Sequence, residues 1–234
     1  MKKIALVTGG TKGIGKALIE TFSENGFDIV TCSRSESDLE KLKKEIEDRF
    51  KNVLEYSKVD MSKKEEVQKF ADEVLKKYPS IDVLINNAGV FIPGQIHEEE
   101  EGILEKMIDT NLYSAYHLTR KIVPSMKNNK HGHIFNICST ASFMAYSNGG
   151  SYCISKFALL GFSKVLRVEM QEFGVRVTSI MPGATMSASW EGVDIPEERF
   201  MPASDVASAV YNAYTMSERT VVEELVLRPQ LGDI

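Results

Sequence analysis

Short runs of hydrophobic residues alternate with longer amphipathic stretches along the whole chain. The short runs are typical of buried strands; they are Ile4–Val7, Phe27–Cys32, Val53–Val59, Ile81–Ile85, Ile134–Cys138, Val175–Ile180 and Val221–Leu227. In the longer stretches apolar residues recur at helical spacing; these stretches are Gly13–Asn25, Ser35–Phe50, Ser62–Lys77, Ile103–Met126, Tyr152–Phe173 and Asp205–Met216. Such alternation, with near-continuous apolar strands, indicates a parallel sheet covered by helices on both faces.

Right-handed crossovers between successive strands would wind this sheet in both directions. The predicted fold class is therefore α/β, a doubly wound, Rossmann-like parallel sheet of about seven strands. No linker, repeat or low-complexity segment interrupts the pattern, so residues 1–234 are expected to form a single domain. The least regular connection, residues 184–201, follows the sixth predicted strand, where such sheets hold their ligands, and is a candidate substrate lid.

Three local predictions concern the starts of helices. Ser62 and Glu65 have the spacing of a capping box, which would open the helix that ends at Lys77. Ser151 directly precedes the predicted helix 152–173 and is a candidate N-cap. The four acids Glu98–Glu101 are interpreted as the solvated start of the long central helix.

Composition is that of an ordinary globular protein, with 43% hydrophobic and 26% charged residues among 234. The formal net charge of −5 argues against a nucleic-acid partner, and no apolar run is long enough for a signal peptide or a membrane span. Three widely spaced cysteines predict reduced thiols in the cytoplasm; they are Cys32, Cys138 and Cys153. Four histidines without metal-ligand spacing are interpreted as surface or loop residues, and no metal site is expected; they are His97, His117, His131 and His133.

A glycine-rich segment, Thr8-Gly9-Gly10-Thr11-Lys12-Gly13-Ile14-Gly15, joins the first predicted strand to the first helix. Glycines let a backbone approach a pyrophosphate closely, and a helix N-terminus offers free N–H groups and the positive end of its dipole. Three residues separate Gly9 from Gly13, which departs from the usual dinucleotide fingerprint. The segment is interpreted as nucleotide-binding, with a plain glycine-rich turn as the alternative. The residues expected at the cofactor are Gly9, Thr11, Lys12, Gly13, Ile14 and Gly15.

The residues after the second predicted strand decide which dinucleotide is expected. NAD-binding sheets usually have an acid about 20 residues after the glycine loop, which holds a ribose hydroxyl. Ser33 and Arg34 stand there instead, and an arginine suits a 2′-phosphate. With Lys12 as a second positive charge, NADP(H) is predicted in preference to NAD(H). The alternatives are that Arg34 and Lys12 are solvated surface charges, or that Glu36 reaches a ribose.

A tyrosine and a lysine stand four positions apart near the start of the predicted helix 152–173. Tyr152 and Lys156 would share one face of that helix, and Ser139, at the end of the fifth predicted strand, can meet them at the carboxyl edge of the sheet. A lysine cation favours the phenolate form of a neighbouring tyrosine, which can then exchange a proton with a carbonyl oxygen. A serine hydroxyl can orient the same oxygen. The spacing alone is also common on helices without a catalytic function.

Together these motifs resemble the short-chain dehydrogenase/reductase family, from Lys3 to about Pro229. Further motifs carry the resemblance: Asp60-Met61 after the third strand, Asn86-Asn87-Ala88-Gly89 after the fourth, Asn111 in the central helix and Pro182-Gly183 after the sixth strand. The sequence departs from the family at Ser187, where threonine is usual, and at Thr185, where a β-branched aliphatic residue is common. The resemblance adds these cofactor contacts: Ser33, Arg34, Asp60, Met61, Asn87, Ala88, Gly89, Tyr152, Lys156, Pro182, Gly183, Thr185 and Ser187.

The resemblance implies an NADP(H)-dependent oxidoreductase that passes hydride directly between the nicotinamide ring and a small carbonyl or alcohol substrate. In this family pattern Tyr152 would exchange the proton with the substrate, and Ser139 would position the substrate oxygen. Lys156 would lower the pKa of Tyr152 and bind the nicotinamide ribose. Asn111 would support a proton relay and completes the expected catalytic set. The family pairs the two long helices, 103–126 and 152–173, with a second subunit, so a homodimer or homotetramer is expected.

Two other functions are considered. The alternative is a non-catalytic dinucleotide-binding regulator on the same fold. Loss of the tyrosine or the lysine would favour this alternative, but both Tyr152 and Lys156 are present. A methyltransferase would carry an acid before the glycine loop, where Thr8 stands. Apolar residues on loops at the carboxyl edge are interpreted as a substrate pocket, with ordinary packing as the alternative; they are Phe91, Ile92, Phe143, Met144, Tyr146, Met186 and Trp190.

Overall fold

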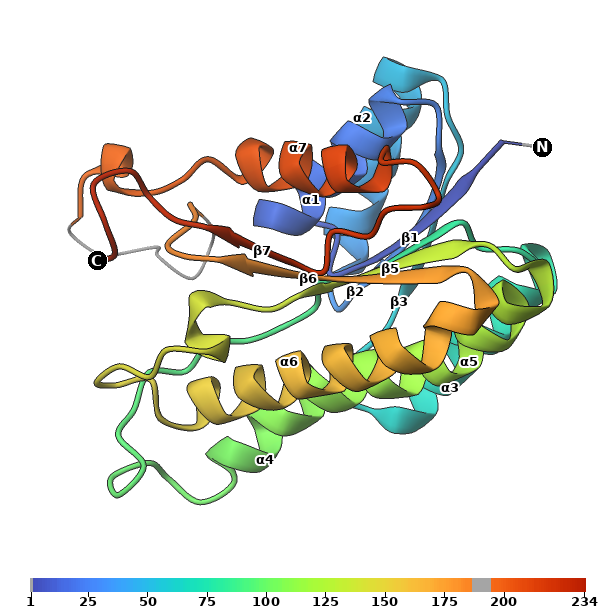
Figure 1. Cartoon of the computed structure of the whole chain (residues 1–234). Coiled ribbons are helices and arrows are strands. Elements are labelled where there is room, and N and C mark those ends of the chain that lie inside the picture. The colour runs from blue at the N-terminus through green and yellow to red at the C-terminus, as the bar shows by residue number, and fades with distance from the viewer. Residues whose placement is uncertain (1, 187–194) are drawn as a thin grey trace.

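One parallel sheet of seven strands runs through the molecule (Figure 1). The computed structural model describes residues 2–186 and 195–234. The strands are β1 (Ile4–Thr8), β2 (Asp28–Ser33), β3 (Leu54–Lys58), β4 (Val83–Asn86), β5 (Gly132–Ile137), β6 (Val175–Pro182) and β7 (Glu224–Leu227). Their order is β3-β2-β1-β4-β5-β6-β7, with parallel neighbours throughout. The predicted doubly wound α/β class is confirmed, and the strand order reverses between β1 and β4.

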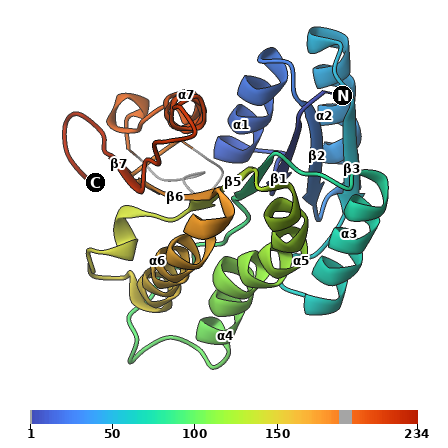
Figure 2. The same ribbon diagram turned by 45° about the vertical axis from the view of Figure 1, so that its right-hand side comes forward.

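Helices cover both faces of the sheet (Figures 1 and 2). One face carries α1 (Gly13–Glu24), α2 (Glu36–Phe50) and α7 (Ala203–Tyr214); the other carries α3 (Lys64–Lys77), α4 (Ile103–Ile108), α5 (Ser114–Asn129) and α6 (Gly150–Met170). Each face has its own apolar core, centred on residues such as Phe22 and Val210 on the first face and Phe70 and Leu118 on the second. None of the described helices combines the length and hydrophobicity that crossing a membrane requires.

The predicted capping box at Ser62 and Glu65 is wrong. Helix α3 begins at Lys64, and its N-cap residue Lys63 makes no side-chain cap. The hydroxyl and backbone N–H of Ser62 instead donate to one carboxylate oxygen of Asp60, over 2.8 and 3.0 Å. An aspartate commonly bonds to the backbone two residues further on in a turn, and this local bond takes the group that the capping box would use.

The predicted central helix, 103–126, is interrupted and runs further than expected. Residues 109–113 form a π-helical turn between α4 and α5, and α5 continues to Asn129. A π-turn inserts one extra residue into the helix and is frequent at functional sites. Asn111 lies within this turn, so the insertion sets the direction in which its side chain points.

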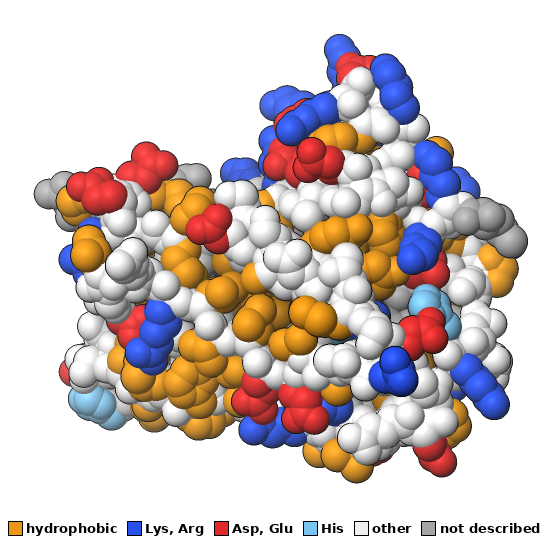
Figure 3. Space-filling view, turned by 45° about the horizontal axis from the view of Figure 1, so that its top comes forward, with side chains coloured by type: hydrophobic (Ala, Val, Ile, Leu, Met, Phe, Trp, Pro, Cys, Tyr) orange, Lys and Arg blue, Asp and Glu red, His pale blue; other side chains and the backbone are white. Residues whose placement is uncertain are grey.

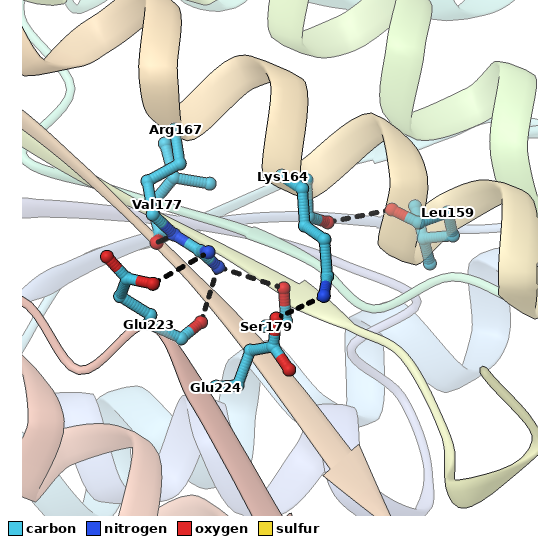
Figure 4. A network of polar contacts seen from close by, with 8 residues as sticks. Leu159, Lys164, Arg167, Val177, Ser179, Glu223 and Glu224 are labelled. Atoms are coloured by element: carbon cyan, nitrogen blue, oxygen red, sulfur yellow. Dashed lines mark hydrogen bonds and ion pairs between the residues drawn. The ribbon is translucent and has the colours of Figure 1, made fainter. Parts of the chain in front are cut away.

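A buried arginine anchors the edge of the sheet (Figure 4). Arg167 of α6 is only 6% exposed, and its Nε donates to the carbonyl oxygen of Val177 in β6 over 2.9 Å. The same guanidinium donates to the carbonyl oxygen of Glu223, the residue directly before β7. These bonds hold β7 against β6. The strand itself, Glu224–Leu227, is shorter than the predicted strand 221–227.

All three cysteines are buried free thiols. Burial raises the pKa of the Cys32 thiol to about 12 and also raises the pKa of Cys138. Because the thiolate is the reactive form, burial protects both residues from oxidation and alkylation.

The expectation that all four histidines are surface or loop residues is wrong for His133. This residue of β5 is fully buried, its ring stacks on Phe135 with centroids 3.9 Å apart, and its Nε2 lies 2.7 Å from the hydroxyl of Thr178. Burial, together with the positive charge of Arg176, lowers the pKa of His133 well below its usual value. The neutral imidazole is therefore part of the folded core.

We expect His133 to make the folded state sensitive to mild acid. The unfolded chain binds a proton at this residue near pH 6.5 whereas the folded chain does not, so the free energy of unfolding falls below about pH 6.5, by up to about 1.4 kcal/mol per pH unit. His133→Phe keeps the stacking on Phe135 and should remove this part of the slope. Urea unfolding between about pH 7.5 and 5.5 measures the difference.

His97→Phe is the matched control, because the His97 side chain is 73% exposed. This variant should keep the pH dependence of the wild type. An unchanged slope in His133→Phe would show that another group controls the acid sensitivity.

Candidate active site

The glycine loop after β1 and the turn after β4 are bonded to each other at the carboxyl edge of the sheet. The Thr8 hydroxyl oxygen accepts hydrogen bonds from the backbone N–H groups of Asn87 and Ala88, over 3.0 and 2.9 Å. The Asn87 side-chain amide donates to the carbonyl oxygens of Thr8 and Gly9, over 2.9 and 3.1 Å. Two of the predicted cofactor segments are thereby fixed against one another at the point where the strand order reverses.

Two positions of the glycine loop require glycine for different reasons, Gly15 because of close packing and Gly9 because of its backbone conformation. A Cβ built on Gly15 would lie 2.2 Å from the Gly9 carbonyl oxygen and 2.6 Å from Nδ2 of Asn87. Gly9 itself has a φ of 68°, a conformation that favours glycine. The N-cap residue of α1, Lys12, makes no side-chain cap, and the first turn holds no acid. The free N–H groups and dipole of this helix end fit the pyrophosphate of a dinucleotide.

The end of β2 presents a positive charge to solvent. Arg34 and Lys12 are both exposed, and neither forms an ion pair with a carboxylate in the part of the chain that the structure describes. Burial opposes ionisation of Asp60, but hydrogen bonds from Ser62 and the charges of Arg34 and Lys63 outweigh it and lower the pKa of Asp60. The side chains of Arg34 and Asp60 therefore lie near each other, where the predicted ribose phosphate and adenine would bind.

Two neighbouring predicted residues turn away from this edge. The hydroxyl of Ser33 accepts a hydrogen bond from the backbone N–H of Ser35 over 3.1 Å, which shapes the start of α2. Met61 is 6% exposed and its sulfur lies 3.5 Å from that of Cys32, within the core. Any contact of Met61 with a cofactor would therefore be made by its backbone.

Tyr152 and Lys156 lie together at the first turns of α6. Lys156 is 5% exposed, and its Nζ lies 5.7 Å from the centroid of the Tyr152 ring. The ammonium donates to the carbonyl oxygen of Ile137, the last residue of β5, over 2.9 Å. A buried ammonium group requires such a partner, because its desolvation costs several kcal/mol.

Ser139 follows β5 and begins a single 3₁₀ turn. Its hydroxyl oxygen accepts a hydrogen bond from the backbone N–H of Ala141, and its own N–H donates to the hydroxyl of Ser142, both over 3.1 Å. No hydrogen bond joins Ser139 to Tyr152 within the described residues, and none of them accepts from the Ser139 hydroxyl. The O–H group is therefore available to donate to a substrate oxygen.

The Asn111 side chain anchors the loop after β4 to α6. Asn111 is 1% exposed; its Oδ1 accepts from the N–H of Val90 over 2.7 Å, and its Nδ2 donates to the carbonyl oxygen of Val90 over 3.0 Å. Nδ2 also donates to the hydroxyl of Ser155, the neighbour of Lys156, over 2.9 Å. Both amide hydrogens of Asn111 are thus used in holding the protein together.

Gly89 allows the side chains of Asn111 and Lys156 to approach the turn after β4. A Cβ at this position would lie 3.2 Å from Oδ1 of Asn111 and 3.7 Å from Nζ of Lys156. The first distance is tight enough that the Asn111 amide would have to shift by a few tenths of an ångström, whereas the second is an ordinary van der Waals contact. The turn thus combines the predicted cofactor contact with a packing requirement of Asn111.

The segment after β6 is fixed by the edge strand β7. The N–H of Gly183 donates to the carbonyl oxygen of Leu227 over 2.8 Å, which directs the end of β6 after Pro182. Thr185 is 4% exposed, and its hydroxyl donates to the carbonyl oxygen of Gly183 over 3.0 Å. Ser187 and Trp190 lie outside the described residues.

One buried amide network beneath the site was missed by the sequence analysis. Asn86 Nδ2 donates to Oδ1 of Asn136 over 2.8 Å and to the hydroxyl of Thr119 over 3.0 Å. Asn136 in turn donates to the hydroxyl of Ser163 in α6 over 2.8 Å. The signal in the sequence is a single asparagine within the apolar run 134–138, where an unpaired amide would be costly.

The interpretation of Glu99 as part of a solvated helix start is wrong. Its carboxylate accepts hydrogen bonds from the N–H and the hydroxyl of Ser151, the first of them over 2.9 Å. Ser151 is therefore not the N-cap of α6, which begins at Gly150. The neighbours Glu98, Glu100 and Glu101 are exposed, as expected.

The surroundings of Tyr152 are apolar. The ring of Phe91 meets the ring of Tyr152 edge to face, with centroids 4.9 Å apart. A cavity of about 370 Å³ next to α6 is lined by Ile96, Ala145, Tyr146, Gly150, Cys153, Ile154 and Phe157, and its lining includes neither Phe91 nor Tyr152. Figure 3 shows hydrophobic side chains gathered on the side of the molecule where the loop between β5 and α6 lies in Figure 1.

Residues 3–197 match the protein-family model described as short chain dehydrogenase. The chain belongs to the short-chain dehydrogenase/reductase family. It is thus an oxidoreductase with the expected fold. The sepiapterin reductase of Chlorobaculum tepidum is 35% identical over 243 residues, which cover 100% of this chain and 99% of that protein.

Solved structures of the same family superpose closely on this short-chain dehydrogenase/reductase. An alcohol dehydrogenase from the archaeon Thermococcus sibiricus, complexed with 5-hydroxy-NADP, has a TM-score of 0.92 and 27% identity, covering 98% of this chain and 97% of that one. A metagenomic short-chain oxidoreductase in complex with NADP has a TM-score of 0.86 and 29% identity, covering 97% of each chain.

We expect Asn111→Ala to destabilise the enzyme by about 2 kcal/mol, because the N–H and C=O of Val90 lose their partner in a buried place. Urea unfolding of the purified variant measures the free energy. Asn128→Ala, at an exposed position of α5, is the control and should change it by less than about 0.5 kcal/mol. Equal stability of the two variants would mean that water replaces the Asn111 amide.

Proposed function

We propose that this enzyme passes hydride between NADP(H) and a carbonyl or secondary-alcohol substrate, with reduction as its working direction. The observation that carries the proposal is the buried ammonium of Lys156 beside the Tyr152 ring, on the helix that follows Ser139. A non-catalytic dinucleotide-binding regulator would need the glycine loop but no lysine held in this way. The enzymatic function therefore accounts for more of the structure than that alternative.

In this proposal the glycine loop and the turn 87–89 would hold the cofactor, which in its reduced form, NADPH, would supply the hydride. Tyr152 donates its phenolic proton to the carbonyl oxygen, and the charge of Lys156 stabilises the phenolate that remains. The free O–H of Ser139 donates a hydrogen bond to the same oxygen and orients it. Asn111 contributes by bonding to Val90 and to Ser155, the residue before Lys156, so its support of a relay is indirect.

The preference for NADP(H) is supported by the two exposed cations near the end of β2. Arg34 and Lys12 have no carboxylate partner among the described residues, so a 2′-phosphate would not have to displace one. Charge-assisted hydrogen bonds from a guanidinium to a phosphate are among the strong ones. The two solved relatives described above were complexed with NADP or 5-hydroxy-NADP.

The substrate would be apolar around its carbonyl group, because the Phe91 ring packs edge to face on the Tyr152 ring. Residues 184–201 would close over it as a lid within a single domain 1–234; residues 187–194 of this segment are outside the described part of the chain. The name of the Chlorobaculum tepidum relative makes sepiapterin one compound to include among the carbonyls tested.

The enzyme would work as a homodimer or homotetramer in the cytoplasm, without a nucleic-acid partner. Exposed apolar side chains on α4, α5 and α6 support the assembly; they include Leu104, Tyr116, Phe157, Val165 and Val168. The buried free thiols support a reducing compartment, and the net charge of −5 is unfavourable for binding a phosphate backbone.

Loss of nicotinamide absorbance over a panel of carbonyl compounds, run with NADPH and with NADH, tests the reaction. With the best carbonyl, Tyr152→Phe should lower kcat by at least about 100-fold, because the proton donor is removed. NADPH binding, followed by fluorescence titration, should stay close to that of the wild type. Tyr56→Phe, on β3 at the far edge of the sheet, is the control and should retain full turnover. Turnover at the wild-type rate in Tyr152→Phe would refute this mechanism.

Arg34→Ala should weaken NADPH binding about 10- to 100-fold, because a charge-assisted hydrogen bond to the 2′-phosphate is lost. Binding of NADH, which lacks this phosphate, should change by no more than about twofold. Titrations of both cofactors measure the two dissociation constants. Arg49→Ala removes an exposed arginine from α2 and controls for the loss of one positive charge. An equal loss for NADH and NADPH would show that Arg34 does not contact the phosphate.

A further inference from the structure

The N-terminus of α6 is capped by a side chain from a distant segment. Its N-cap residue, Gly149, has no side chain to offer. Instead Glu99, in the loop between β4 and α4, accepts a hydrogen bond at Oε1 from the N–H of Ser151 over 2.9 Å, and at Oε2 from the Ser151 hydroxyl. Ser151 is 2% exposed, so these bonds are sheltered from water. A carboxylate at this helix end also interacts favourably with the helix dipole.

The backbone around Glu99 is shaped to admit this carboxylate. A Cβ on Gly150 would lie 2.1 Å from Oε1 of Glu99, and a Cβ on Gly94 would lie 2.7 Å from its Cγ. Gly94 pairs with Gly149 in an isolated parallel bridge, and its N–H donates to the carbonyl oxygen of Asn148 over 3.0 Å. The loop around Gly94 and the start of α6 therefore form one tightly packed contact, which we call the Glu99 joint. Glycine at positions 94 and 150 leaves the space that the Glu99 side chain occupies.

The Glu99 joint lies directly beside the proposed proton donor. Ser151 is the residue before Tyr152, and Phe91, at the beginning of the same loop, packs edge to face on the Tyr152 ring. Helix ends fray when their first N–H groups lack acceptors. Lys156, one turn further along, is already fixed by its bond to Ile137. The first turn of α6 carries Tyr152, and the hydrogen bonds between Glu99 and Ser151 hold this turn as the bond to Ile137 holds Lys156.

We propose that Glu99 is a positioning residue for Tyr152: it holds the first turn of α6 so that the phenolic oxygen stays in line with the substrate carbonyl. This inference rests on the proposed function, because it assigns Glu99 a part in the proton transfer. The three other acids of the run 98–101 are exposed and carry no such role. Glu99 acts through Ser151 and touches neither substrate nor cofactor.

Glu99→Ala, Glu99→Gln and the control Glu100→Ala test the proposal in the full-length enzyme. In Glu99→Ala, amide hydrogen exchange of residues 151–153 should quicken about fivefold or more, as expected for a lost helix cap. Its kcat with the best carbonyl should fall about tenfold or more, because small misplacements of a reacting group are costly, while the dissociation constant of NADPH stays within about twofold. Glu99→Gln can still accept from the N–H and donate to the hydroxyl of Ser151, so it should recover most of both losses. Glu100→Ala should match the wild type.

Unchanged exchange at residues 151–153 in Glu99→Ala would overturn the proposal, whatever the turnover. So would an equal loss of kcat and NADPH affinity, or a failure of Glu99→Gln to recover, because either result indicates a general structural defect. A wild type that reduces no carbonyl would refute the proposed function instead, and the exchange measurement would then decide this inference alone. If Glu99→Ala does not fold, Glu99→Asp, which is one methylene too short to reach both donors, takes its place.

Discussion

Lys156 carries a charged ammonium group at a position where only 5% of the residue is exposed. A buried charge costs several kcal/mol unless it is paired or hydrogen-bonded, and the available acceptor is the carbonyl oxygen of Ile137. Meeting this need places α6 against the end of β5, and Gly89 leaves room for the lysine on the other side. The proximity of Tyr152 then follows from helical spacing alone. The geometry of the proposed catalytic pair is thus the consequence of a solvation requirement.

Neutral amides hold the elements around that lysine. Asn111 joins the loop after β4 to Ser155, and Asn86 and Asn136 join β4 and β5 to α5 and α6. An amide offers donors and acceptors in fixed directions, so each bond sets the register of two elements, which apolar contacts do less strictly. These hydrogen bonds therefore act together with the apolar packing of Leu159 and Leu166 to fix where α6 sits on the sheet.

The order of strands and helices and the fold class could be predicted from the sequence, because burial leaves a periodic record along each element. That record does not identify the partner of a polar group. Glu99 belongs to a run of four acids, and it meets Ser151 only in the folded chain. Ser62 has the spacing of a helix cap, but its hydroxyl donates to Asp60 instead. The π-turn around Asn111 and the burial of His133 were missed for the same reason, since each depends on contacts between distant segments.

The two ends of the proposed cofactor site use cations in opposite ways. Lys156 is buried, hydrogen-bonded and held at a fixed distance from Tyr152, so its charge acts without reorganisation when a phenolate forms. Arg34 is exposed and has the nearby Asp60 as its electrostatic neighbour, while Asp60 itself is hydrogen-bonded to Ser62. A phosphate arriving at Arg34 would meet a cation whose neighbouring carboxylate, Asp60, already accepts hydrogen bonds from Ser62. A fixed charge suits the proposed chemical step, whereas an exposed charge suits the capture of an anion from water.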